Sequence, residues 1–403
     1  MSQDTPARPL DVPREGIPSL VNKNIDDAVE RLASGTGPIA VDTERAMGLR
    51  YSNRAYLIQM RRKGTGTLLI DPVGIEDRLG GLREVMKDEW ILHAADQDLP
   101  CLHELGLYPT KVFDTELAAL ILGYERVSLQ AITQQVTGWT LAKEHSNSDW
   151  SQRPLSPPLL AYAALDVELL HELAHEMTIE LNEAGRFEWF EQECEEVRLR
   201  KPPAPLKQPW RRTSRQAGIR DRRALAMLRE LWTVRDDLAR KRDLAPGKVL
   251  PNKVLAELAS RKPRSRADVL NSSLFRSRSR RADVDTWWEA IDIAWRLDER
   301  ALPERRFNEA QDPYPPVNRW DRHDTDAVAR WEVLRLTVLK TADEIGIRQD
   351  ILIKPAIQRT AAWKGWTSET ELATIFTNEG ARPWQIEQIT PRVHDAAVEA
   401  GVV

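Results

Sequence analysis

The chain has 403 residues, of which 41% are hydrophobic and 30% charged, and its formal net charge is −4 at pH 7. This composition excludes a collagen-like, disulfide-rich or disordered chain and predicts a globular protein of two or three domains. The two cysteines, Cys101 and Cys194, stand far apart in no metal-binding spacing, which predicts a reducing compartment. Residues 1–20 contain no apolar run, and no stretch is long enough to span a bilayer. We therefore expect a cytoplasmic protein without a membrane partner.

The charge is unevenly distributed along the chain. Residues 201–300 contain 25 Lys and Arg against 13 Asp and Glu, a balance of +12, which leaves −16 for the remainder. A basic segment of this kind indicates a polyanionic partner. A solvated helical surface is the alternative, and it explains such a balance about as often.

The first half of the chain alternates between strand and helix patterns. Residues 1–20 are polar and rich in proline, which predicts a disordered tail. From residue 21 to about 200, short apolar runs predict strands and the stretches between them predict helices. A mixed sheet flanked by helices is the expected architecture. The expected strands cover 37–44, 55–60, 66–72 and 90–96, residues 112–120 pass from a strand into a helix, and the expected helices cover 24–34, 76–88 and 98–106.

The second half is predicted to be helical. Two Pro-rich segments, 201–218 and 301–323, predict linkers around the helical blocks 219–300 and 324–403. Leucines recur at helical spacing in the first block, as in Leu225, Leu228 and Leu231. The second block has a similar size and periodicity, so we interpret the two blocks as a divergent repeat. The expected fold is an α/β domain at 21–200 followed by two all-α domains.

Two carboxylates mark the end of the first expected strand. Asp42 and Glu44 stand two residues apart, and because side chains alternate along a strand, both project from the same face. Close carboxylates at a sheet edge repel one another unless a cation neutralises them. Mg²⁺ or Mn²⁺ suits such a pair, since both ions prefer oxygen ligands. A solvated strand end is the simpler interpretation of this pair taken alone.

Three more residues support a site. Asp98 follows the strand expected at 90–96, at the start of a helix. Tyr162 and Asp166 lie four residues apart in a single helix expected over 157–184. Residues at this spacing share one face of a helix. The phenol and the carboxylate are therefore expected to point the same way.

Five motifs occur in one order along the first domain. They are D-x-E at 42–44, H-A-x-x-x-D-L at 93–99, F-D-T at 113–115, S-D-W-x-x-R-P-L-S at 148–156 and Y-A-x-x-D-V at 162–167. Each is weak alone, but together they resemble the DEDD exonucleases that carry a tyrosine in the third motif, and most closely the ribonuclease D family. The resemblance covers about 180 residues. Residues 220–259 resemble the HRDC domain of that family, and the last block resembles its second, more divergent HRDC-like module.

The resemblance implies both a fold and a reaction. It implies an RNase H-like α/β domain that hydrolyses RNA from the 3′ end and releases 5′-mononucleotides, with tRNA precursors or other structured RNAs as substrates. Carried over by motif, Asp42, Glu44, Asp98 and Asp166 would hold two Mg²⁺ or Mn²⁺ ions, and Tyr162 would orient the attacking water. Two cations ~4 Å apart can activate that water and stabilise the leaving 3′ oxygen.

Alternatives remain open at this point. The same chemistry on DNA, in a repair exonuclease, is one, although the chain has no G-x-x-x-x-G-K-[ST] motif of a helicase. A catalytically silent scaffold that binds nucleic acid is another, and the filled acidic positions argue against it. Within the second motif, the resemblance selects Asp98 rather than Asp96, because the ligand of the family directly precedes the leucine.

Seven residues are candidates for contact with nucleic acid. Arg45 either reaches a substrate phosphate or is exposed. Trp150 and Arg153 either line the substrate groove or pack their segment onto the helix that follows. A basic loop between two helices of the first helical block supplies the other candidates, Lys241, Arg242, Lys248 and Lys253. No protein partner is predicted.

A zinc peptidase is a further alternative. Residues 171–175 read His-Glu-Leu-Ala-His, which fits H-E-x-x-H. On a helical wheel that starts at Tyr162, His171 and His175 fall on the side opposite the catalytic pair and the leucine stripe. A metal site would then form on the solvent side of the helix. A chance match explains the motif better.

Overall fold

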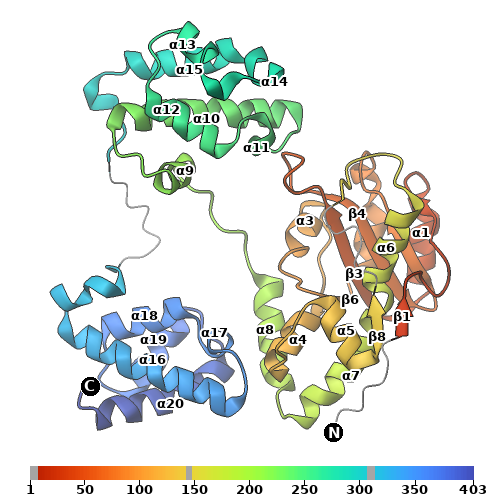
Figure 1. Cartoon of the computed structure of the whole chain (residues 1–403). Helices are drawn as coiled ribbons and strands as arrows, with labels where there is room; N and C mark the ends of the chain where they lie inside the picture. The colour runs from red at the N-terminus through yellow and green to blue at the C-terminus, as the bar shows by residue number, and fades with distance from the viewer. Residues whose placement is uncertain (1–7, 142–147, 306–313) are drawn as a thin grey trace. The chain divides into compact units, whose positions relative to one another are not determined.

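The computed structural model describes residues 8–141, 148–305 and 314–403 (Figure 1). Residues 1–7 of the expected tail and 306–313 of the second expected linker lie outside the described residues. By its internal contacts the chain divides into two compact units. The first consists of Met1–Glu44, Ala55–Lys201 and Asp312–Val403, and the second of Arg45–Arg54 and Pro202–Gln311. No described helix combines the length and the apolar character that crossing a membrane requires.

A six-stranded sheet forms the centre of the first unit. Its neighbouring strands β4 and β5 are antiparallel. The pairs β5 with β2, β3 with β6 and β6 with β7 are parallel. The predicted mixed sheet is therefore confirmed. The strands follow the order β2 (Leu20–Val21), β5 (Gly66–Ile70), β4 (Ala55–Lys63), β3 (Thr36–Arg45), β6 (Glu89–Leu92), β7 (Lys111–Asp114).

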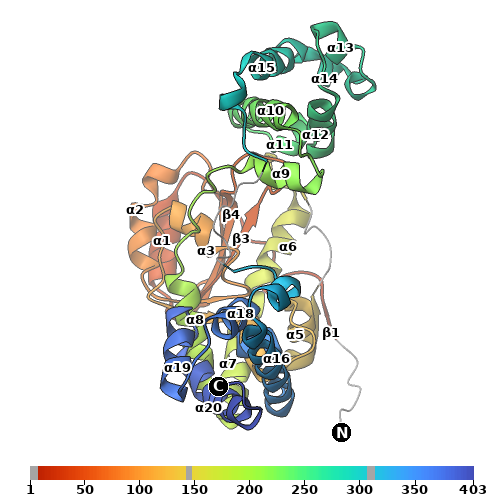
Figure 2. The same ribbon diagram turned by 90° about the vertical axis from the view of Figure 1, so that its left-hand side faces the viewer.

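Helices cover both faces of this sheet (Figure 2). Ile39 and Val41 of β3 pack into one core, with residues from α1 (Ile25–Ala33), α2 (Gly80–Val85) and α3 (Leu99–Glu104). Ala40, between them, faces the other core, because successive side chains of a strand point to opposite faces. That second core contains residues of α4 (Thr115–Leu122), α5 (Leu129–Thr137), α7 (Leu170–Glu183) and α8 (Phe187–Leu199).

The N-terminal segment is more ordered than the sequence predicts. Instead of a tail over 1–20, β1 (Arg8–Leu10) pairs in parallel with β8 (Trp139–Leu141). Leu10 is buried, and the guanidinium groups of Arg8 and Arg14 lie 5.9 and 5.0 Å from the ring centroid of Trp139. The prediction was wrong for residues 8–20, because these stabilising partners lie about 130 residues further along the chain.

The expected single helix over 157–184 is two helices. Helix α6 (Pro157–Glu168) ends and α7 begins at Leu169, whose φ of −109° and ψ of 2° are not helical. Leu165 and Leu169 pack into a small cluster with Leu10, whereas Leu170 belongs to the large core that the C-terminal helices share. No Gly or Pro lies near Leu169 to signal a break, so tertiary packing overrides the local helix propensity at this position.

The C-terminal helical block belongs to the first unit. Trp384 stacks on Trp189 of α8 at a centroid distance of 4.8 Å, and Arg382 donates to the buried Glu193 of α8 at 2.6 Å. The two parts also share one hydrophobic core. The block consists of α16 (Thr325–Ile345), α17 (Gln349–Leu352), α18 (Pro355–Lys364), α19 (Glu369–Asn378) and α20 (Pro383–Glu399), after a short 3₁₀ helix at Val317–Arg322 inside the second expected linker.

The second unit is helical, as predicted for 219–300. Leu225, Leu228 and Leu231 are buried in its core. Trp210 is buried in the same core, so residues 210–216 of the expected linker form a helix of this unit. The helices are α9 (Trp210–Gln216), α10 (Arg222–Arg242), α11 (Pro246–Val249), α12 (Asn252–Arg261), α13 (Arg266–Leu270), α14 (Arg278–Ala282) and α15 (Val284–Arg296).

Residues 45–54, which directly follow β3, also belong to this second unit. The Tyr51 hydroxyl donates to Asp236 at 2.9 Å, and the Ala245 amide donates to the Leu49 carbonyl at 3.0 Å.

Candidate active site

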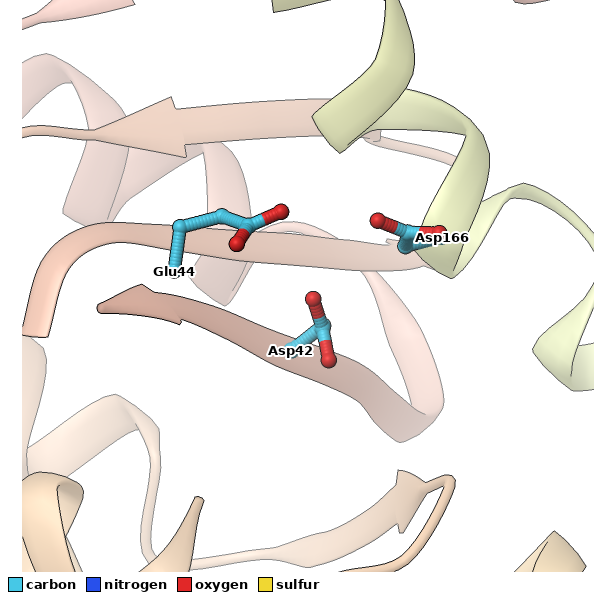
Figure 3. A group of neighbouring side chains, drawn as sticks. All are labelled: Asp42, Glu44 and Asp166. Carbon is cyan, nitrogen blue, oxygen red and sulfur yellow. The ribbon is translucent and has the colours of Figure 1, made fainter. Parts of the chain in front are cut away.

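Three carboxylates converge in the first unit. Asp42 and Glu44 extend from β3, and Asp166 extends toward them from α6 (Figure 3). One oxygen of each lies within 4.8 Å of the others. Among the described residues this is the one group of three or more His, Cys, Asp or Glu side chains arranged to hold a metal ion.

The strand itself explains the pairing of Asp42 with Glu44. Residues 40, 42 and 44 share one face of β3, and Ala40 anchors that face in the core that α7 lines. The Gln59 side-chain amide, on the neighbouring strand β4, donates to Asp42 Oδ2 at 3.2 Å. No sequence pattern points to Gln59, because only the register of two strands brings it beside Asp42.

The electrostatics of the group call for a cation. Burial, and then the charges of Asp98, Asp166 and Glu44, raise the pKa of Asp42 well above its usual value. Burial, and then the charge of Asp98, raise the pKa of Asp166 to about 8. Such shifts show that protons compete for these oxygens in the metal-free protein. Hard carboxylate oxygens in this number fit a divalent ion such as Mg²⁺ or Mn²⁺.

Asp98 lies beside the group but not within it. It is buried and accepts a hydrogen bond from the Thr43 hydroxyl at 2.5 Å. Thr43 occupies the face of β3 opposite Asp42 and Glu44. Asp98 therefore approaches the edge of the strand from the side of α3, and its charge still raises the pKa values of Asp42 and Asp166. By contrast, Asp96 is exposed and lies 3.8 Å from Arg200.

Tyr162 is half-buried on α6, one helical turn before Asp166. Burial, and then the charges of Asp166, Glu44 and Asp42, raise the pKa of its phenol above the usual value. Tyr162 therefore keeps its proton at neutral pH. The phenol is thus close enough to the three carboxylates for their charges to act on it, and its role in the reaction stays a prediction.

Trp150 and Arg153 are held by packing and by hydrogen bonds within the first unit, and a further role in lining the substrate groove stays a prediction. Trp150 is 1% exposed, and its ring centroid lies 6.2 Å from that of Tyr162. Arg153 donates to both oxygens of Asp71 and to the carbonyls of Tyr56, Trp150 and Gln152, which occupies its N–H groups. Packing of the segment, the alternative interpretation, is what the structure shows. Asp71 lies 82 positions away, and no local pattern points to it.

The basic candidates of the second unit differ in availability. Lys241, Lys248 and Lys253 are exposed. Arg242 forms a two-point ion pair with Asp283, at 2.8 and 2.5 Å, which ties its guanidinium to its own unit. Arg45 is half-buried at the end of β3. Contact of these residues with nucleic acid stays a prediction.

The H-E-x-x-H segment does not assemble a zinc site in the described structure. His171 Nε2 lies 3.0 Å from the Pro38 carbonyl, Glu172 pairs with Arg14, and His175 is exposed. The expectation that His171 faces solvent was wrong, because the break at Leu169 changes the phase of the helix. His171 and Glu172 have different partners and His175 is exposed, so the motif is a chance match.

A three-layer α/β fold with an acidic group at the end of a central strand is that of a nuclease. Residues 20–182 match the family model described as a 3′–5′ exonuclease. Residues 224–291 match the HRDC domain, and residues 313–397 match the 3′ to 5′ exonuclease C-terminal domain. The resemblance of the last block to a second HRDC module stays a prediction, since its match carries another description.

Individual relatives give the particular family. The chain is 31% identical to ribonuclease D of Xanthomonas oryzae pv. oryzae over 274 residues, which cover 65% of this chain and 73% of the relative. A solved protein from Bifidobacterium adolescentis covers 97% of this chain and 99% of its own, with 33% identity and a TM-score of 0.87. The structure of Escherichia coli RNase D matches 95% of this chain and 99% of its own chain, with 25% identity and a TM-score of 0.67.

The chain belongs to the ribonuclease D family. The matched segments span between 66% and 84% of the bacterial relatives' own length. The chain is thus a 3′–5′ exoribonuclease that acts on RNA, and the family depends on divalent metal. The fold class and the family that the five motifs predict are confirmed.

Proposed function

We propose that this protein trims the 3′ ends of structured RNAs, tRNA precursors above all, with two divalent metal ions held by Asp42, Glu44, Asp98 and Asp166. The convergence of three of these carboxylates within 4.8 Å supports the proposal most directly. The proximity of Asp98, whose charge raises the pKa values of Asp42 and Asp166, supports its role as the fourth ligand.

The chemistry of the reaction divides between the ions and the chain. Bound here, Mg²⁺ or Mn²⁺ supplies the Lewis acidity that activates the attacking water and stabilises the leaving 3′ oxygen. The strand holds Asp42 and Glu44 on one face, and Gln59 also donates a hydrogen bond to Asp42. Tyr162 keeps its phenolic proton, so it orients the water by hydrogen bonding and does not act as the base.

Two features support RNA with structure near its 3′ end as the substrate. The solved E. coli relative is described as an exoribonuclease involved in structured RNA processing. The second unit carries the basic segment, with a balance of +12 over residues 201–300, and phosphate contacts dominate the affinity of such a surface for nucleic acid. We propose that this unit holds the body of the RNA, and that the protein works in the cytoplasm, in keeping with its two cysteines, which form no disulfide.

The decisive experiment measures release of 5′-mononucleotides. The substrates are a 3′-extended tRNA precursor, a single-stranded RNA and a DNA of matched sequence, each with Mg²⁺, Mn²⁺ or EDTA. The variants are Asp42→Asn and Asp98→Asn, with Asp96→Asn as the matched control, because Asp96 is exposed and only two positions from Asp98. We expect metal-dependent turnover of RNA that both active-site variants lose by at least ~100-fold and the control retains.

Other outcomes would each correct a different part of the proposal. Preference for DNA would indicate a repair exonuclease. Binding of RNA without turnover under any metal would indicate a scaffold. Full activity of Asp98→Asn together with loss in Asp96→Asn would exchange the roles of the two acids.

A further inference from the structure

Asp114 is a buried carboxylate that the proposed reaction does not use. It ends strand β7, directly before α4, and is 2% exposed. Its Oδ1 accepts hydrogen bonds from the amides of Glu116 at 2.9 Å and Leu117 at 3.4 Å, as the N-cap of α4 does. Two further amides, from a different part of the chain, also donate to it. A helix cap alone does not explain that second pair.

The second pair comes from the loop between β6 and α3. The Ala94 amide donates to Asp114 Oδ1 at 3.0 Å, and the Ala95 amide donates to Oδ2 at 2.8 Å. Ala94 has a φ of 58°, in the left-handed region that favours glycine. A non-glycine residue in this region is strained. Hydrogen bonds to a charged acceptor are stronger than those between neutral groups, and the two amides that donate to Asp114 hold the loop in this conformation.

This loop determines where Asp98 stands. The Ala95 carbonyl accepts hydrogen bonds from the amides of Asp98 at 3.2 Å and Leu99 at 3.0 Å. Asp98 is the N-cap residue of α3, but its side chain caps no amide of that helix. The position of Asp98 therefore depends on Ala95, and the position of Ala95 depends on Asp114.

We propose that Asp114 is a positioning residue, which sets the backbone that aims the Asp98 carboxylate at the metal site. This inference rests on the proposed function, in which Asp98 is a metal ligand. Asp114 lies on β7, sixteen residues after Asp98, and acts on it only through the Ala94–Ala95 backbone. The F-D-T motif thereby gains a role in catalysis without touching the substrate.

The geometry requires a carboxylate rather than an amide. Four amide donors converge on two oxygens, and a carboxylate can accept from all of them. In Asp114→Asn, an oxygen at the Oδ1 position keeps the donors from Ala94 and α4. The NH₂ group then faces the Ala95 amide across 2.8 Å, donor against donor. Either Ala95 moves away or the side chain turns, and the hydrogen bonds that place Asp98 change in both cases.

The test compares Asp114→Asn with Val112→Ala, a buried apolar residue of the same strand that packs in the core with α1, α2 and α3. Binding of Mn²⁺ to the RNA-free full-length protein is measured by electron paramagnetic resonance, together with the melting temperature and the KM for RNA. Loss of a residue that orients a metal ligand weakens metal binding by roughly 10–100-fold. We expect at least a 10-fold weaker Mn²⁺ affinity in Asp114→Asn, a KM for RNA within about twofold of wild type, and normal Mn²⁺ affinity in Val112→Ala at a similar melting temperature.

The Asp98→Asn variant, measured in parallel, separates the two proposals. If Asp98→Asn weakens Mn²⁺ binding and Asp114→Asn does not, the positioning role of Asp114 is overturned while the proposed function stands. If Asp98→Asn itself leaves Mn²⁺ binding unchanged, the assignment of Asp98 as a ligand fails. Equal loss of Mn²⁺ affinity in Asp114→Asn and Val112→Ala would show that Asp114 only stabilises the fold.

Discussion

The buried ion pair between Arg382 and Glu193 predicts a large stability effect for one substitution. Arg382→Met removes a guanidinium that donates to Glu193 at 2.6 Å, where the two side chains are only 8% and 11% exposed. The remaining Glu193 keeps one donor, the indole N–H of Trp384 at 2.9 Å. Breaking a buried pair from one side costs about 3–5 kcal/mol, because it leaves an uncompensated charge. Because this one donor remains, we expect Arg382→Met to lower the free energy of unfolding by about 3 kcal/mol, the lower end of that range.

The assay is thermal unfolding of the full-length protein, where 3 kcal/mol corresponds to a fall of roughly 6 °C for a unit of this size. Arg392→Met is the matched control in the same helix, because Arg392 pairs with Glu344 at 2.8 Å with both side chains close to half exposed. An exposed pair contributes at most ~1 kcal/mol. Equal melting temperatures for the two variants would refute the reasoning. A double substitution, Arg382→Met with Glu193→Gln, is expected to recover part of the loss.

Three further substitutions test other parts of the structure. Gly123→Ala should lower the free energy of unfolding by about 3 kcal/mol, because the φ of Gly123 is +84° and a Cβ would meet the Gly346 carbonyl oxygen at 2.1 Å. Gly138→Ala is the control: its φ is +75° but a Cβ there would meet open space, so thermal unfolding should show a loss of only about 1 kcal/mol. Burial lowers the pKa of His93 to about 4. The folded state therefore resists protonation of His93, and up to about 3 kcal/mol of the unfolding free energy present above pH ~6.5 is lost as the pH falls toward 4. His93→Gln should flatten this part of the profile of unfolding free energy against pH. An unchanged slope in the variant would contradict this prediction. Lys248→Glu should weaken RNA binding measured in EDTA and reduce the slope of log affinity against log salt by about 0.7, the value for one phosphate contact on a single strand, and an unaltered slope would remove this lysine from the interface.

Sequence patterns predict the proximity of Asp42, Glu44 and Asp166 because most of this geometry is local. Asp42 and Glu44 share a strand face through simple alternation, and Tyr162 and Asp166 share a helix face through their spacing of four residues. The five strands from β3 to β7 also lie where apolar runs predict them. Only Asp98 departs from the predicted set of four, since it accepts a hydrogen bond from Thr43 on the opposite face of β3. No sequence pattern contains that contact, which joins residues 55 positions apart.

Differences between prediction and structure share one physical cause, which is a partner distant in sequence. Arg153 has the side chain of a phosphate ligand, but it donates to both carboxylate oxygens of Asp71, which directly follows β5. Arg8 and Leu10 look like part of a tail, but β8 provides a strand edge and an aromatic ring for them. The break at Leu169 carries no local signal, because it arises where two hydrophobic clusters meet. Composition and periodicity report only on neighbours along the chain.

The ten residues that follow Glu44 limit how freely this architecture can be rearranged. Residues 45–54 leave the catalytic strand, yet Leu49 and Tyr51 find their hydrogen-bond partners in the second unit, at Ala245 and Asp236. A fragment cut in the Pro-rich segment near residue 201 would remove those partners from a loop that begins one residue after Glu44, a proposed metal ligand. The helical unit therefore cannot be exchanged independently of residues 45–54. Grafting it onto another nuclease, or replacing it with a foreign RNA-binding module, would require the loop to be transplanted with it.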